Sequence, residues 1–107
     1  MSKFVATRNK GFRIGFNNGF EISVQWGPEN YCERRDHTDF DKPQKERFWE
    51  SRSAEVAIID KEGGFISLGE DTVAGWLSSD QVANLIAIVS FAKNKKELNR
   101  RIKALNI

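Results

Sequence analysis

One cysteine and one histidine, Cys32 and His37, lie five residues apart in a segment rich in acidic side chains. A Cys–His pair can act as nucleophile and base, but the thiolate needs a lowered pKa, and neighbouring carboxylates such as Glu33 and Asp36 raise it. A structural zinc site needs about four nitrogen or sulfur ligands, more than this chain supplies. The aspartates between residues 36 and 41 do not keep calcium-loop spacing. We therefore expect no catalytic residue, no metal ion, no cofactor and no enzymatic activity.

The other chemically informative side chains are aromatic rings and arginines, which together suit binding. Rings stack on nucleobases, and guanidinium groups hold phosphates. The candidate ligand-binding residues are Arg100, Arg101, Arg34, Arg35, Trp49, Trp76, Phe65 and Tyr31. Arg100 and Arg101 are the strongest candidates because they lie near the end of an expected helix. For the aromatic residues the alternative is core packing, which we favour for Phe65 and Trp76.

Charge is unevenly distributed along the chain, although its formal net value is only +2. Residues 93–107 contain six of the 17 lysines and arginines but one acidic residue, whereas residues 53–92 contain one basic and six acidic residues. The basic C-terminal cluster could attract phosphates of nucleic acid or of a small nucleotide. A solvated helix face is the simpler alternative.

Length and composition limit the number of domains and the cellular compartment of the chain. A chain of 107 residues with 39% hydrophobic and 30% charged residues supports one modest core, so we expect a single domain over 1–107. The longest mainly apolar run, 82–92, is too short to span a bilayer, and residues 1–8 lack the apolar stretch of a secretory signal. One cysteine cannot form an intrachain disulfide. These features predict a cytoplasmic protein with no membrane partner.

Alternating apolar residues in 12–16 and 20–26 flank Asn17-Asn18-Gly19, which predicts a β-hairpin with a tight turn. A long polar and charged loop follows, at about 27–50. Loops of that length without secondary structure are often functional, so residues 29–50 are a candidate surface for a ligand or partner.

A second hairpin is expected from 54–60 and 65–68, with a further short strand at 72–77. Ser78 and Gln81 have the spacing of a capping box and predict a helix start. An apolar stripe follows, made of Val82, Leu85, Ile86 and Val89. The expected fold is therefore α+β: an antiparallel β-sheet built from hairpins, covered by a C-terminal helix or helix pair at about 79–105.

A second apolar stripe contains Leu98, Ile102 and Leu105, and it is out of phase with the first. Either the chain breaks near Asn94 and a second helix returns to the core, or one long helix carries an extra stripe that another protomer must cover. The second account requires assembly, and we expect a homo-oligomer.

The stretch after the first hairpin turn contains Ser23-Val24-Gln25-Trp26-Gly27 followed by Asn30-Tyr31-Cys32. In this stretch, and also at 11–20, 54–60 and 75–83, the chain resembles a family of small phage-encoded accessory proteins. Within such proteins the chain is most similar to the anti-Thoeris signal-sponge family, whose members sequester a cyclic ADP-ribose isomer made by bacterial TIR enzymes. The resemblance implies a sheet-plus-helix protomer, an oligomer with ligand pockets between protomers, and binding without cleavage. It also implies that the protein acts in the cytoplasm of the host bacterium. It does not inform residues 33–50 or 95–107.

Three functions compete at this stage. The first is an anti-defence sponge that binds a small nucleotide signal. Its arginines would hold the diphosphate, and Trp49, Trp76 or Phe65 would stack on the adenine. The second is a protein inhibitor of a bacterial defence complex, of the anti-CRISPR kind, which would use the loop 29–50. The third is a nucleic-acid-binding accessory protein that uses the basic C-terminus and loses affinity steeply with salt.

Overall fold

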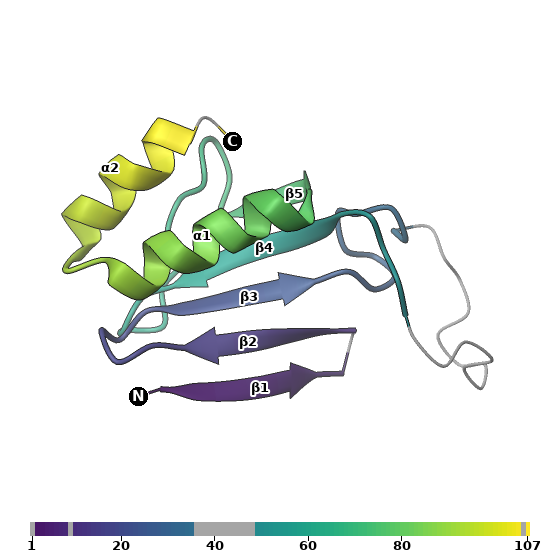
Figure 1. Ribbon diagram of the computed structural model, residues 1–107, viewed down its shortest axis with the longest axis horizontal. Helices are drawn as coiled ribbons and strands as arrows, with labels where there is room; N and C mark the ends of the chain where they lie inside the picture. Colours follow the sequence, from purple (N-terminus) through teal and green to yellow (C-terminus); the bar gives the residue numbers. More distant parts are fainter. Residues whose placement is uncertain (1, 9, 36–48, 106) are drawn as a thin grey trace.

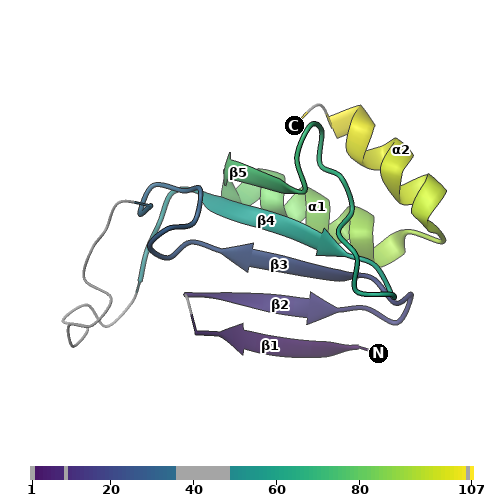
Figure 2. The same cartoon turned by 180° about the vertical axis from the view of Figure 1, so that it is seen from behind.

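The computed structural model describes residues 2–8, 10–35, 49–105 and 107. Its strands and helices are β1 (Lys3–Thr7), β2 (Gly11–Gly15), β3 (Glu21–Gln25), β4 (Ala54–Ile59), β5 (Val73–Leu77), α1 (Ser79–Phe91) and α2 (Lys95–Leu105). The strands form one antiparallel sheet in chain order, and both helices lie on the same side of it (Figures 1 and 2). The expected α+β fold, an antiparallel sheet covered by a C-terminal helix pair, is confirmed.

The β2–β3 hairpin forms where the sequence predicted it. Ile14 pairs with Ile22 and Phe12 with Val24, and Gly19 adopts a φ of 92°, which glycine tolerates because it has no side chain. Ile22 and Val24 are buried on the helix-bearing face. This hairpin therefore contributes part of the sheet side of the core.

The rest of the sheet departs from the expected strands in two ways. The sequence interpretation did not predict β1, which pairs along its whole length with β2. The predicted turn at 61–64 forms, but the predicted strand 65–68 is wrong. Pairing after the turn stops at a single bridge between Ile59 and Phe65, and β4 pairs with β5 instead. Ile66 and Leu68 are buried in the core although their segment is irregular.

Helix α1 begins at the predicted capping box. The Ser78 hydroxyl accepts a hydrogen bond from the Gln81 backbone N–H at 3.2 Å, and the Gln81 side chain accepts one from the Ser78 N–H at 2.8 Å. Val82, Leu85 and Val89 are buried against β3 and β4. Complete burial of a leucine or valine side chain contributes about 1.5–3 kcal/mol, so this stripe anchors α1 on the sheet.

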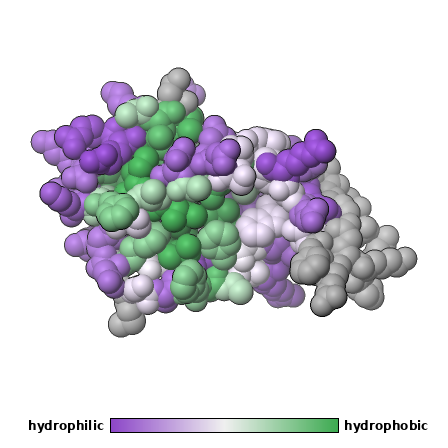
Figure 3. Space-filling model, in the orientation of Figure 1, coloured by the Kyte–Doolittle hydropathy of each residue, from purple (hydrophilic) through white to green (hydrophobic). Residues whose placement is uncertain are grey.

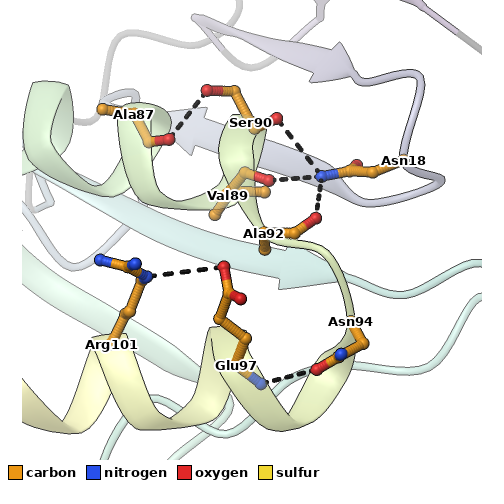
Figure 4. A network of polar contacts seen from close by, with 8 residues as sticks. All are labelled: Asn18, Ala87, Val89, Ser90, Ala92, Asn94, Glu97 and Arg101. Atoms are coloured by element: carbon orange, nitrogen blue, oxygen red, sulfur yellow. Dashed lines mark hydrogen bonds and ion pairs between the residues drawn. The ribbon is translucent and has the colours of Figure 1, made fainter.

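The chain breaks between the helices, as the first of the two accounts requires. Ala92 is extended, with φ −62° and ψ 129°, and the Asn94 side chain accepts a hydrogen bond from the Glu97 N–H at 2.8 Å at the start of α2 (Figure 4). Leu98 and Ile102 are buried in the same core as α1. The account with one long helix and a stripe left for another protomer is therefore wrong for these two residues.

Asn18, in the β2–β3 turn, fixes the end of α1. Its side-chain amide donates to the carbonyls of Val89 and Ala92 at 2.8 and 2.9 Å, with a longer contact to Ser90 at 3.4 Å (Figure 4). Its carbonyl oxygen accepts from the Phe20 N–H at 3.0 Å. The last carbonyls of a helix have no partner within the helix, so Asn18 both closes the turn and caps α1.

Candidate functional site

A groove between α2 and the irregular segment that follows β4 has the most suitable chemistry for an anionic ligand. Its volume is about 470 Å³, within the range of small-molecule sites. It is lined by Phe65, Ser67, Gly69, Lys95, Asn99, Ile102, Lys103 and Ile107.

Helical spacing explains how α2 presents polar groups to this groove. Leu98 and Ile102 face the core, so Lys95, Asn99 and Lys103, four residues apart, form a polar row along the groove. On the other wall the buried Ile66 and Leu68 alternate with exposed Phe65 and Ser67. The Phe65 ring is 57% exposed, so the expectation that it packs in the core is wrong.

Asp60 lies next to Lys95 of this groove and partly offsets its positive charge. Its carboxylate accepts hydrogen bonds from the backbone N–H groups of Gly64 and Glu62 at 2.9 and 3.0 Å, and it lies 3.8 Å from the Lys95 ammonium group. The hydrogen bond from Gly64 has the largest effect on the pKa of Asp60 and lowers it, and desolvation, the next largest, raises it. The bond from Glu62 and the charge of Lys95 add to the lowering, so the pKa of Asp60 lies below its ordinary value. The turn therefore stays anionic near neutral pH, and Lys103 has no such carboxylate partner among the described residues.

A second group of predicted residues lies where β3 ends and β4 begins. The Tyr31 and Trp76 rings stack with centroids 5.5 Å apart, and the Arg35 guanidinium lies 5.3 Å from the Tyr31 ring centre. Tyr31 is 40% exposed and Trp76 57%, so the expectation of core packing for Trp76 is also wrong. This aromatic cluster, Tyr31, Arg35 and Trp76, is open to a partner.

Backbone geometry holds the aromatic cluster in place. The β4–β5 register shifts between Ala54 and Val56, and Trp76 has a φ of 51°, which is rare for a bulky residue. The Trp76 N–H donates to the Tyr31 carbonyl at 2.7 Å, and the Tyr31 N–H donates to the Glu55 carboxylate at 2.9 Å. The bulge thus turns an indole away from the core and onto Tyr31.

Arg34 and Trp49 belong to a third group of contacts, which also includes Trp26. The Arg34 guanidinium lies 4.5 Å from the centre of the Trp49 ring, and its Nε donates to the Glu50 carbonyl. The Trp49 indole donates to the Trp26 carbonyl at 3.2 Å, and the Trp26 indole donates to the Trp49 carbonyl at 2.9 Å. The reciprocal bonds join Trp49 to Trp26, and Arg34 packs over the Trp49 ring, so Trp49 and Arg34 have a structural role here.

Arg100 and Arg101 lie outside the α2 groove. Arg101 is 3.6 Å from the Glu97 carboxylate and borders a shallow notch of about 350 Å³ with Ala87, Ile88 and Phe91. Arg100 is exposed on α2. The eight candidate residues therefore fall into separate groups, and within one chain Arg101 contacts neither Arg34 nor the aromatic cluster.

One further cavity was missed by the sequence interpretation. It has a volume of about 490 Å³ and lies under the first turn of α1. Its walls are Phe12, Val24, Trp26, Ser51, Arg52, Ser53, Ala54, Leu77, Ser79 and Val82. Only strand alternation, which places Phe12, Val24 and Trp26 on one face, could have indicated it from the sequence.

Of the two residues considered for nucleophilic chemistry, the structure describes only Cys32. Cys32 is buried, and its thiol contacts the Gly27 carbonyl at 3.6 Å. His37 lies outside the described residues, as does most of the expected loop 29–50. Within the described part of the chain no three His, Cys, Asp or Glu side chains are grouped to hold a metal ion.

No family model, curated protein or solved structure that we compared with the chain matches it. Neither described helix has the length and apolar character needed to cross a bilayer.

Proposed function

We propose that this chain is a phage anti-defence protein that binds a small nucleotide signal, of the cyclic ADP-ribose type, and sequesters it without cleavage. One observation carries the proposal: the exposed Phe65 ring borders the same groove as Lys95 and Lys103. A planar apolar surface beside two ammonium groups suits a ligand that has a purine at one end and a diphosphate at the other.

The groove also favours retention over turnover. Stacking of a base on an aromatic ring contributes about 1–3 kcal/mol, and the lysines offset the charge of the phosphates. Asn99 can donate to and accept from a ribose or a base. Ser67 is the one side-chain hydroxyl among the described lining residues, and none of their side chains is an imidazole or a carboxylate that could activate it.

Isothermal titration calorimetry with ADP-ribose and cyclic ADP-ribose tests the site. We expect Phe65→Ala and Lys103→Ala each to weaken binding at least about fivefold, since stacking of a base is worth about 1–3 kcal/mol and a hydrogen bond between charged groups about 1.5–3 kcal/mol. Lys96→Ala is the matched control, because Lys96 lies on α2 but does not line the groove. It should bind as the unaltered protein does.

Arg101→Ala decides between the groove and the notch beside Phe91. Both Arg101 and Lys103 lie on α2, but only Lys103 lines the groove. If Arg101→Ala abolishes binding while Lys103→Ala does not, the groove is the wrong site. Native mass spectrometry of protein isolated from a host with an active signalling cyclase then tests retention: the bound nucleotide should be released by heat with its mass unchanged.

A second candidate function, inhibition of a bacterial defence complex by direct contact, is favoured by the aromatic cluster. Trp, Tyr and Arg are the side chains most often responsible for affinity at protein interfaces, and Tyr31, Arg35 and Trp76 combine all three at an exposed surface. If this function is correct, Trp76→Ala and Arg35→Glu should abolish protection of phage in an infection assay. Phe65→Ala should leave it intact.

A further inference from the structure

Strand β1 carries an apolar surface that the helices leave open. Its residues Phe4 and Ala6 pair with Ile14 and Phe12 of β2, so they face the same side as the core. Helix α1 packs on β3 and β4, and the Phe4 side chain is 85% exposed. Figure 3 shows the apolar surface continuing from α1 toward β1 and β2.

The same strand is an edge of the sheet. In the described chain β1 pairs only with β2, so the backbone groups on its other side are available to another strand. Soluble proteins usually protect such an edge with charged side chains, above all lysine, or with proline, a bulge or an inward-facing charge. β1 has a regular five-residue register and no proline. Its one charged residue, Lys3, is at the start of the strand and on the face away from the helices, so it leaves Phe4 and Ala6 unprotected. Another β-strand with an apolar face would satisfy both features, because it would pair with the open edge and cover the exposed side chains.

We propose that the occupant is β1 of a second copy, paired antiparallel about a two-fold axis at Val5. Val5 is the middle residue of β1, so this register pairs all five residues of both strands. Phe4 then lies opposite Ala6 of the second copy, a large side chain beside a small one. Lys3 lies opposite Thr7, so no like charges face each other.

The pairing completes the open surface in both copies. The two-fold axis passes between the two paired β1 strands and runs perpendicular to the sheet, so the helices of both copies lie on the same side of one continuous sheet. The two Phe4 side chains become neighbours at the centre of that face. Phe91 of α1, 82% exposed, lies on the same side of the sheet. This assembly does not depend on the proposed ligand, because the α2 groove uses none of these residues.

Cysteine cross-linking tests the register. Directly opposed residues in an antiparallel pair have Cβ atoms about 4.5–5.5 Å apart, close enough for a disulfide after a small adjustment. Val5→Cys should therefore form a covalent dimer under mild oxidation. The native thiol does not compete, because Cys32 is 1% exposed.

Lys3→Cys is the matched control on the same strand and face. In the proposed register its two copies are four residues apart along the strands, roughly 14 Å, and should not cross-link. The double variant Lys3→Cys/Thr7→Cys should cross-link, because it restores a directly opposed pair. Equal cross-linking of Val5→Cys and Lys3→Cys, or none with Val5→Cys in a folded protein, would overturn the proposal.

Solution mass gives an independent readout. Light scattering after size exclusion should show a dimer for the unaltered chain. Phe4→Lys should raise the dimer dissociation constant at least about tenfold while the circular dichroism spectrum stays unchanged. A monomer at all concentrations, or a Phe4→Lys protein as dimeric as the unaltered chain, would exclude this interface.

Discussion

Asn18→Ala should destabilise the protein by about 2 kcal/mol. The substitution removes the two shorter hydrogen bonds to the Val89 and Ala92 carbonyls and the one from the Phe20 N–H. At about 0.5–1.5 kcal/mol net for each bond, three bonds give about 1.5–4.5 kcal/mol. Water can reach part of the helix end and replace some of this, which lowers the expected loss. For a domain of this size the melting temperature should fall by roughly 8–16 °C.

Two further variants make this prediction specific. Asn18→Asp keeps the acceptor for Phe20 but places a carboxylate against the carbonyl end of α1, so it should destabilise at least as much as alanine. Asn17→Ala, at the exposed neighbouring position, should change stability by less than about 0.5 kcal/mol. Urea unfolding followed by fluorescence measures all three. An Asn18→Asp protein as stable as the unaltered one would refute the capping role.

Three other perturbations test the packing and the turns. Leu98→Ala should lower the free energy of unfolding by about 2–5 kcal/mol, because the Leu98 side chain of α2 is fully buried in the core. Thermal or urea unfolding measures this loss, and a loss near zero would mean that α2 does not pack there. Gly75→Ala should lower the free energy of unfolding by about 1–3 kcal/mol, because the new Cβ would lie 2.5 Å from the Tyr31 Cβ. It should also alter tryptophan fluorescence, and an unchanged spectrum would contradict the stacking of Tyr31 on Trp76. The lowered pKa of Asp60 means that its contribution to stability is complete above its unfolded pKa of about 4 and is lost as pH falls through the folded value. Asp60→Asn should therefore weaken the protein at pH 7, and this loss should shrink as the pH falls below about 4. A loss that does not change with pH would argue against the hydrogen bonds to the Asp60 carboxylate.

Local patterns in the sequence were sufficient for much of the fold. The Asn-Gly turn with alternating residues on both sides specified the β2–β3 hairpin, and Ser78 with Gln81 specified the start of α1. These features depend on residues close together in the chain. β1 was missed because Thr7 and Lys10 flank a connection with no glycine or proline to indicate a turn. Ile66 and Leu68 alternate as in a strand, yet burial under the helices determines their conformation.

The site was less predictable because it depends on distant contacts. The type of each side chain indicated binding, but no local pattern showed that Phe65 borders the same groove as Lys103 while Arg101 faces the other side of α2. The positive φ of Trp76 has no local sequence signal either. Asn18 was interpreted only as a turn residue, although its partners lie more than 70 positions away.

The order of the strands has a consequence for how fast the protein folds. Every pair in the sheet joins strands that are consecutive in the chain, but β3 and β4 are separated by residues 26–53. Closing that segment costs about 1.5 kcal/mol more entropy than closing the β2–β3 turn. Folding should therefore start separately in the β2–β3 hairpin and in the C-terminal half, and the joining of β3 to β4 should limit the rate. Shortening the segment between Trp26 and Trp49, with both indoles retained, should then speed folding more than it changes the rate of unfolding.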